Sequence, residues 1–366
     1  MAIELIRALY DSNTPIPDKD EYYNEAIEDI EFFDISSQIY HLLKQAGKLE
    51  ETPLFFQKRL KQKYTEALYQ NLFIKNQTEM LLKEFERSGI EVIPIKGTVF
   101  AEQYFGHIGA RSTSDIDLLI KNNELDRAIE CINTLGFTPD LKDIPSGFNL
   151  TFNKELPQST IPLMVELHWN IVDPTTADLN IEEFWNQSKP FQDFNYVKEL
   201  SDFHTFYMIV LHGWRHNMNS LKYFIDILQL IHNCQGRLDL ITLFKVAKDD
   251  KTLKRLIRTL TTVYTQFSYL EQLIKLPSKK RYIFWNYEHI RNTDNRSIKK
   301  YFDFFDYQIF SYDSIRFSIK ELCIWFLPPT ELINVEKEMN NRNIAFLYIR
   351  LFKKRISNFL KTIRHT

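Results

Sequence analysis

Glycine, cysteine and long apolar segments are all scarce in this chain of 366 residues. Nine glycines leave few positions for tight turns, while 29 phenylalanines are available for burial, and this balance indicates a helix-rich protein. The three cysteines (Cys131, Cys234 and Cys323) are odd in number and far apart, which excludes a disulfide framework and favours a reducing cytoplasm. Apolar runs such as residues 206–211 are too short to span a bilayer, and the first residues lack the pattern of a secretory signal, so we expect a cytoplasmic protein.

Charge of one sign does not dominate the chain either. The net charge of −2 lacks the excess of positive charge that is typical of nucleic-acid-binding proteins, so nucleic acid is not expected as a partner. The C-terminal end differs, because no acid follows Glu338 while seven basic residues do. A helical apolar stripe lies among them, formed by Tyr348, Phe352, Ile356, Phe359 and Ile363. This end is either a docked last helix with a solvated basic face or a contact surface for an anionic membrane or an acidic partner.

Two carboxylates one residue apart, Asp115 and Asp117, are the most informative feature of the chain. In a strand their side chains point to the same face, while Ile116 and Leu118 enter the core behind them. Like charges held side by side need a cation, and hard oxygen ligands select Mg²⁺ or Mn²⁺, which bind nucleotide phosphates. An Asp-x-Asp pair also occurs on exposed loops, but this pair precedes an apolar run and follows a Lys96-Gly97-Thr98 turn.

The pattern of apolar residues predicts an α+β protein. A long helix should begin after Pro53 and end at Gly89. Strands are expected at residues 91–95, 115–120, around 148–152 and at 163–168. Helices are expected at 99–104, from about 123 to Gly136, at about 202–217, at 220–233, and within 239–275, 297–326 and 336–363. Residues 1–18 should be irregular, and the connection 138–162 should form a flap or a long loop.

These elements group into three parts. We expect an N-terminal helical segment with the long strut helix (1–90), a catalytic core with a small mixed sheet and flanking helices (91–172), and a helical C-terminal domain (173–366).

A third acid, Glu166, shares a strand face with Met164 and His168. Transfer of a phosphoryl-type group needs charge neutralisation and in-line positioning, and two metal ions about 3.5–4 Å apart supply both. Asp115 and Asp117 would bridge the ions, and Glu166 would complete one site or accept the proton of the attacking hydroxyl. The alternative for Glu166 is a residue on the rim of a half-exposed strand, and His168 is either catalytic or a hydrogen-bonded core residue.

Several residues near the acids are candidate ligands of the phosphates. Gly97 leaves the backbone bare, Thr98 adds a hydroxyl, and the following helix presents free N–H groups. Further donors are Arg111, Ser112 and Ser114, and Lys96 either joins them or pairs with a buried carboxylate. Arg111 could equally be a surface residue.

His212 and His216 lie four residues apart and therefore on one helix face, with Asp226 in the next helix. Zinc binding would need a third ligand, and none has suitable spacing. The two remaining interpretations are a polar network between helices and a surface across the cleft that meets the nucleotide or the acceptor. Asp226 is a candidate to orient His216.

These motifs resemble a known family. Lys96-Gly97, Tyr104, Arg111 and the run from Asp115 to Leu119 resemble the signature of an uncharacterised bacterial nucleotidyltransferase family in the DNA polymerase beta-like nucleotidyltransferase superfamily. The resemblance spans roughly residues 55–235 and includes Gly136-Phe137, Glu166-Leu167-His168-Trp169, Leu211-His212, His216 and the run from Tyr223 to Ile227. Two departures are a threonine where the superfamily has serine or glycine in the turn, and a longer spacing from the turn to the acids.

The resemblance implies a nucleotidyltransferase-type sheet and transfer of a nucleoside monophosphate from a nucleoside triphosphate, ATP among them, to an acceptor, with release of pyrophosphate. The acceptor would be a small molecule, a peptide or a sugar. Asp115, Asp117 and Glu166 would hold Mg²⁺ or Mn²⁺, and Gly97-Thr98 would form the triphosphate turn. The alternatives are a non-catalytic nucleotide-binding or scaffold protein of the same fold, and a toxin–antitoxin-type enzyme that modifies RNA or protein.

Overall fold

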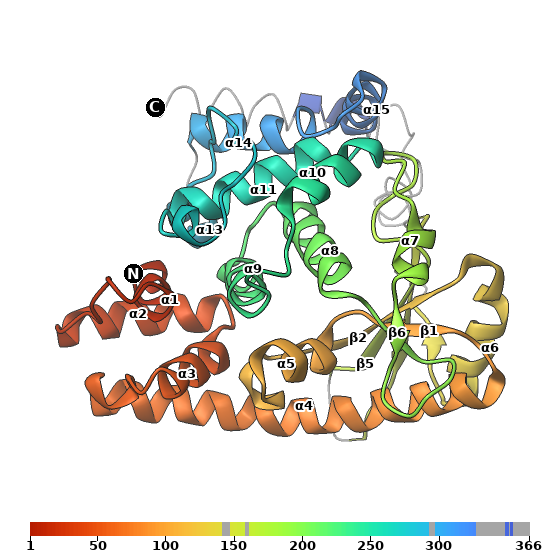
Figure 1. Cartoon of the computed structure of the whole chain (residues 1–366), viewed down its shortest axis with the longest axis horizontal. Helices are drawn as coiled ribbons and strands as arrows, with labels where there is room; N and C mark the ends of the chain where they lie inside the picture. Colours follow the sequence, from red (N-terminus) through yellow and green to blue (C-terminus); the bar gives the residue numbers. More distant parts are fainter. Residues whose placement is uncertain (141–146, 158–160, 293–296, 327–347, 351, 354–366) are drawn as a thin grey trace.

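The computed structural model describes residues 1–140, 147–157, 161–292, 297–326, 348–350 and 352–353. Its main sheet is five-stranded and mixed. Many helices flank the sheet and the C-terminal part is mostly helical (Figure 1), which confirms the expected α+β class. The strands lie in the order β1-β2-β5-β4-β3. Their bounds are β1 Val92–Pro94, β2 Asp115–Ile120, β3 Thr138–Pro139, β4 Asn149–Lys154 and β5 Leu163–His168.

The two acid-bearing strands are neighbours. β2 pairs with β5 in parallel, and Asp117 lies opposite Glu166 in the register. The other pairings in the sheet are antiparallel. Ile116, Leu118 and Ile120 of β2 enter the core on one face of the sheet, which leaves the aspartates on the other face, as alternation predicts. Strand β4 confirms the strand expected around 148–152, whereas β3 lies at the start of the segment 138–162 that was expected to be a flap or a long loop.

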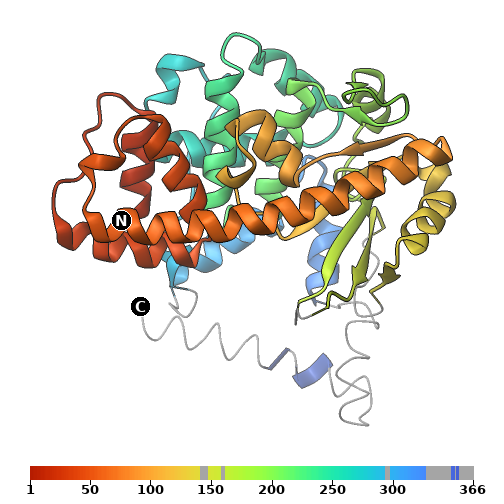
Figure 2. The same ribbon diagram turned by 90° about the horizontal axis from the view of Figure 1, so that it is seen from below.

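A single helix of 35 residues, α4 (Leu54–Ser88), runs along one side of the molecule (Figure 2). Pro53 precedes its first turn, and Gly89 ends it in the left-handed conformation at φ 64°, both as predicted. One half of α4 packs against α3 (Ser36–Gln45), and the other half packs with α6 (Leu125–Thr134) against the sheet. The strut helix therefore fixes the sheet relative to the N-terminal helices.

The N-terminal residues are more regular than predicted. Helix α1 (Ala2–Tyr10) lies within the segment expected to be irregular, and Ala2, Leu5 and Ile6 are fully buried. Pro15 and Pro17, which prompted that expectation, follow the helix. Helix α2 (Asp20–Phe32) comes next. The expectation for residues 1–18 was thus wrong for the first half, because a short amphipathic helix gains its stability from packing that local sequence does not reveal.

Helices α8 (Asp202–Arg215) and α9 (Leu221–Asn233) cover the aspartate face of the sheet together with α5 (Gly97–Phe105). Ser201 and Ser220 accept hydrogen bonds from backbone N–H groups in the first turns of α8 and α9, so both helices begin where the sequence predicts. The remaining α-helices are α7 Ile181–Asn186, α10 Leu240–Asp249, α11 Leu253–Gln266, α12 Leu270–Leu273, α13 Tyr287–Arg291, α14 Ile298–Gln308 and α15 Ile315–Phe326. The short elements are β6 Lys189–Pro190, β7 Lys198–Glu199 and the 3-10 helices Leu49–Glu51, Ile108–Ala110 and Asn122–Glu124.

The C-terminal basic stripe falls mostly outside the described residues, so its role stays a prediction. Among the residues that the structure does describe, none of the helices combines the length and apolarity that a membrane span requires.

Candidate functional site

A pocket of about 250 Å³ separates the acidic face of the sheet from α8 and α9. Its lining combines acids from the strands, the turn before α5, and basic and aromatic side chains from the two helices. The lining residues are Lys96, Gly97, Arg111, Thr113, Ser114, Asp115, Asp117, Glu166, His212, Arg215, His216, Lys222 and Tyr223. All three predicted catalytic acids therefore open onto one cavity.

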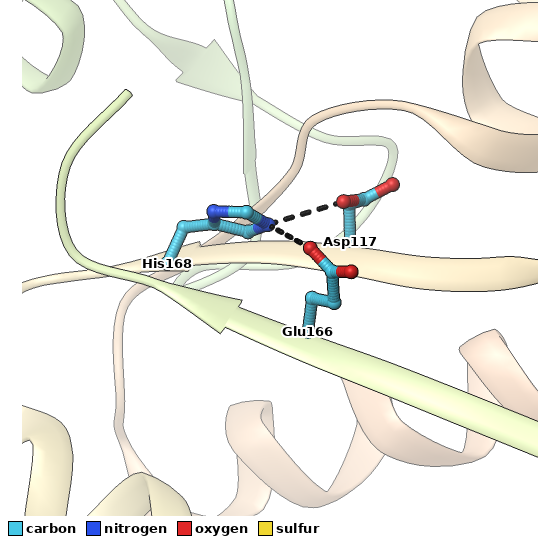
Figure 3. A group of neighbouring side chains, drawn as sticks. All are labelled: Asp117, Glu166 and His168. Carbon is cyan, nitrogen blue, oxygen red and sulfur yellow. Dashed lines mark hydrogen bonds and ion pairs between the residues drawn. The ribbon is translucent and has the colours of Figure 1, made fainter. Parts of the chain in front are cut away.

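Two acids of this lining, Asp117 and Glu166, form a close cluster with the buried His168 (Figure 3). The His168 Nε2 atom lies 3.1 Å from Asp117 Oδ1 and 3.2 Å from Glu166 Oε2. One ligand atom from each residue lies within 4.8 Å of the others, a spacing that suits a metal ion. Burial lowers the pKa of His168, but its hydrogen bonds to the two carboxylates outweigh burial, and the net shift is upward. The same hydrogen bond from His168 lowers the pKa of Glu166.

Lys96 pairs with the deepest of the acids. Its Nζ atom lies 2.7 Å from Asp117 Oδ1, and the Asp117 side chain is only 2% exposed. Burial alone would raise the pKa of Asp117, but Lys96 and His168 hold it well below its ordinary value, so the carboxylate is charged. Of the two roles predicted for Lys96, the structure shows the pairing with a buried carboxylate.

Asp115 lines the same pocket but stands outside the Asp117–Glu166–His168 cluster. Burial raises the pKa of Asp115, and the negative charges of Asp117 and Glu166 raise it further against the opposing effects of Lys96 and Lys222. Its assignment as a metal ligand stays a prediction.

The turn before α5 requires glycine. Gly97 has φ +66°, a left-handed conformation that costs a residue with a Cβ atom free energy. An added Cβ would lie 3.5 Å from both Asp115 O and Thr113 Cγ2, so the turn packs directly against the start of β2. Gly97 lines the pocket at the N-terminus of α5, where unpaired N–H groups favour an anion.

The other predicted phosphate ligands divide into two groups. Ser114 is exposed and lines the pocket. In the described chain, Thr98 and Ser112 are buried and are not part of the lining. Ser112 instead donates to Asp34 Oδ2 at 2.5 Å.

Arg111 and Asp226 form a buried pair with two parallel hydrogen bonds. Arg111 Nε and Nη2 each lie 2.8 Å from an Asp226 oxygen, and the two side chains are 8% and 1% exposed. The alternative that Arg111 lies on the surface was therefore wrong. Both oxygens of Asp226 accept hydrogen bonds from Arg111, so its partner is Arg111 and not the predicted His216. The pair joins the segment before β2 to α9.

His212 and His216 face the acids across the pocket. The ring of His216 stacks on Tyr223 at 5.3 Å between centroids and 8° between planes, and it meets His212 edge-on at 4.7 Å. Burial lowers the pKa of His216 to about 4 and also lowers that of His212, so both rings are neutral at pH 7. Within the described chain neither belongs to a group of three metal-type ligands. The arrangement supports the interpretation that they line the cleft.

Sequence reasoning missed residues that only the fold brings to the site. Asn71 of α4 is fully buried and donates to the carbonyls of Ile108 and Arg111 at 2.6 and 2.7 Å, while its oxygen accepts from Thr113 N–H at 3.1 Å. It thereby fixes the segment that leads into β2. An amide within the apolar stripe of a helix was the available signal. Lys222 of α9 was also missed, because a lysine near a helix start usually lies in solvent.

Comparison with known proteins gives one match. A family model described as an uncharacterised nucleotidyltransferase matches residues 30–266, more than half of the chain. No curated protein and no solved structure matches.

Proposed function

The chain belongs to this family of uncharacterised nucleotidyltransferases, and from that premise we propose that it transfers a nucleoside monophosphate from a nucleoside triphosphate to an acceptor. An acceptor oxygen would attack the α-phosphorus, the bond from that phosphorus to the β-phosphate bridge would break, and pyrophosphate would leave. The observation that carries the proposal is the pairing of Asp117 with Glu166 on parallel strands beside Asp115, in a pocket whose opposite wall is basic.

Three carboxylates of this site fit a hard divalent cation. Asp115, Asp117 and Glu166 would hold Mg²⁺ or Mn²⁺, since carboxylate oxygens are the ligands that these ions prefer. The position of Asp115 in the same pocket lining as Asp117 and Glu166 supports this assignment. When bound, the cation would neutralise charge on the triphosphate and orient it.

Other groups of the site would bind the phosphates, accept a proton and position the acids. The Gly97 turn and the start of α5 would bind phosphate oxygens through backbone N–H groups. Glu166 is ionised at neutral pH, since the hydrogen bond from His168 lowers its pKa, and it would accept the proton of the acceptor hydroxyl. His168 would position Glu166 and Asp117 through the two contacts that it makes with them.

Label transfer tests the proposal. The protein is incubated with each α-³²P-labelled nucleoside triphosphate, Mg²⁺ and cell extract, beside an Asp115→Ala/Asp117→Ala variant. A Glu130→Ala variant is the control, since Glu130 is an exposed acid on α6 outside the pocket. We expect a labelled acceptor with wild type and the control, and only background with the double variant.

Each other outcome has a defined meaning. Equal label with wild type and the double variant contradicts the proposal. Nucleotide binding without transfer from any of the four triphosphates supports the non-catalytic alternative. Loss of the labelled product on treatment with ribonuclease or protease identifies RNA or protein as the acceptor and so supports the toxin-type alternative.

A further inference from the structure

We propose that Lys222, at the start of α9, binds the triphosphate of the nucleotide opposite the Gly97 turn. This inference rests on the proposed function and adds a residue from the helical C-terminal part to the phosphate site. The substrate would then contact both the sheet and α9.

The Lys222 ammonium group is a positive charge without a close counter-ion. Its hydrogen bond to Ser112 Oγ is long at 3.4 Å, and it forms no ion pair with any residue that the structure describes. Three carboxylates act on it electrostatically. Asp34 accepts from Ser112 and Asp226 accepts twice from Arg111, while Asp115 lines the same pocket as a predicted metal ligand. A half-buried ammonium group in this state favours an anionic ligand.

Lys222 lies on the same side of the pocket as the Gly97 turn, where the phosphates would bind. Lys222 contacts Ser112, and the Gly97 turn packs against Thr113 and Asp115, so the lysine and the turn flank the same short segment before β2. Both also line the pocket. An anion held at the start of α5 therefore lies within reach of a cation from α9.

The other side of the pocket is left for the acceptor. Glu166 lies on β5, and the Arg215 guanidinium stacks over the ring of Phe148, next to β4, at 4.7 Å from its centroid. The backbone carbonyl of Phe148 accepts a hydrogen bond from the N–H of Trp169, directly after β5. Arg215 therefore belongs to the β5–β4 side, whereas Lys222 belongs to the β2 side.

The electrostatics agree with this geometry. Burial, together with the charge of Arg111, lowers the pKa of Lys222 to about 8. The group still carries its proton for most of the time at pH 7, and a bound polyphosphate would offset the cost of that buried charge. A compact ammonium group also suits phosphate oxygens.

Equilibrium binding tests the inference. Isothermal titration calorimetry is run with the Mg²⁺ complexes of ATP, GTP, CTP and UTP, and the tightest binder is compared with its own monophosphate. The variants are Lys222→Gln, Lys222→Met and Lys222→Arg, with Lys245→Gln on the exposed face of α10 as the matched control. Thermal unfolding verifies that each variant is folded, and the methionine variant retains the apolar stem if glutamine is not tolerated.

We expect neutral substitutions at Lys222 to weaken triphosphate binding by about tenfold or more and monophosphate binding by less than about threefold, because one charge-assisted contact to phosphate is lost. Lys222→Arg should restore most of the affinity, and Lys245→Gln should bind like wild type. Unchanged triphosphate binding in the neutral variants, an equal loss for both nucleotides, or no triphosphate binding by wild type would overturn the inference. Failure of the proposed function is separate, since wild type would then bind triphosphate with the expected Lys222 dependence but transfer no label.

Discussion

Removing one partner of the buried Arg111–Asp226 pair should destabilise the protein far more than removing both. The two side chains are 8% and 1% exposed and make two hydrogen bonds of 2.8 Å, so both charged groups are largely desolvated in the folded state. In the Arg111→Met variant the Asp226 carboxylate keeps a weak hydrogen bond from Gln38 Nε2, at 3.4 Å. Stranding a buried charge in this way typically costs about 3–5 kcal/mol of unfolding free energy.

The double variant Arg111→Met/Asp226→Leu leaves no stranded charge. Apolar replacement of a whole buried pair is often close to neutral, so we expect the double variant to lie within about 2 kcal/mol of wild type. The pair joins the segment before β2 to α9, and the single variants should therefore also weaken nucleotide binding.

Urea titration at pH 7.5 measures these differences, and a double-mutant cycle isolates the interaction between the two residues. Lys63→Met is the control, because Lys63 and Glu66 form an exposed pair on α4 that should contribute little. A cost below about 1 kcal/mol for Arg111→Met, or additive losses in the double variant, would refute the reasoning that the pair is buried and coupled.

Three further predictions follow from single residues. Asn71→Ala should lower the unfolding free energy by about 3 kcal/mol, since it leaves buried backbone groups without partners, and a change below about 1 kcal/mol in a urea titration would contradict this. Gly97→Ala should cost about 1–2 kcal/mol through its φ of +66° and should weaken triphosphate binding; calorimetry showing wild-type affinity would refute the second part. Burial lowers the pKa of His204 to about 4 in the folded protein. Between about pH 6.5 and pH 4 this histidine is therefore protonated in the unfolded chain but neutral in the folded one, so the folded state loses stability as the pH falls through this range. The fall in melting temperature from pH 7 to 5 should therefore be smaller in His204→Gln than in wild type, and an equal fall would argue against this assignment.

Local signals in the sequence were sufficient for much of the fold. Strand β2 has the predicted bounds because its apolar residues alternate with the acids and enter the core. The ends of α4 follow from Pro53 and Gly89, and the starts of α8 and α9 follow from their serine caps. These features depend on interactions between residues a few positions apart, which a sequence displays directly.

The site needed long-range information that the sequence does not display. Alternation predicts that Asp115 and Asp117 share one strand face and that Glu166 and His168 share another, but the opposition of Asp117 and Glu166 across β2 and β5 depends on strand register. Asp226 could not be assigned to Arg111, because the two residues are 115 positions apart and His216 is nearer in the chain. Lys222 was missed because a lysine near a helix start usually lies in solvent, and its contact with Ser112 joins residues 110 positions apart.

The identity of the transferred phosphorus tests the central claim most directly. Parallel reactions receive the same nucleoside triphosphate labelled with ³²P at either the α or the γ position, and the label in the acceptor is counted. A nucleotidyltransferase should move the α label into the acceptor and release the γ label in pyrophosphate. Transfer of the γ label, or of neither label in the presence of Mg²⁺ and cell extract, would contradict the account.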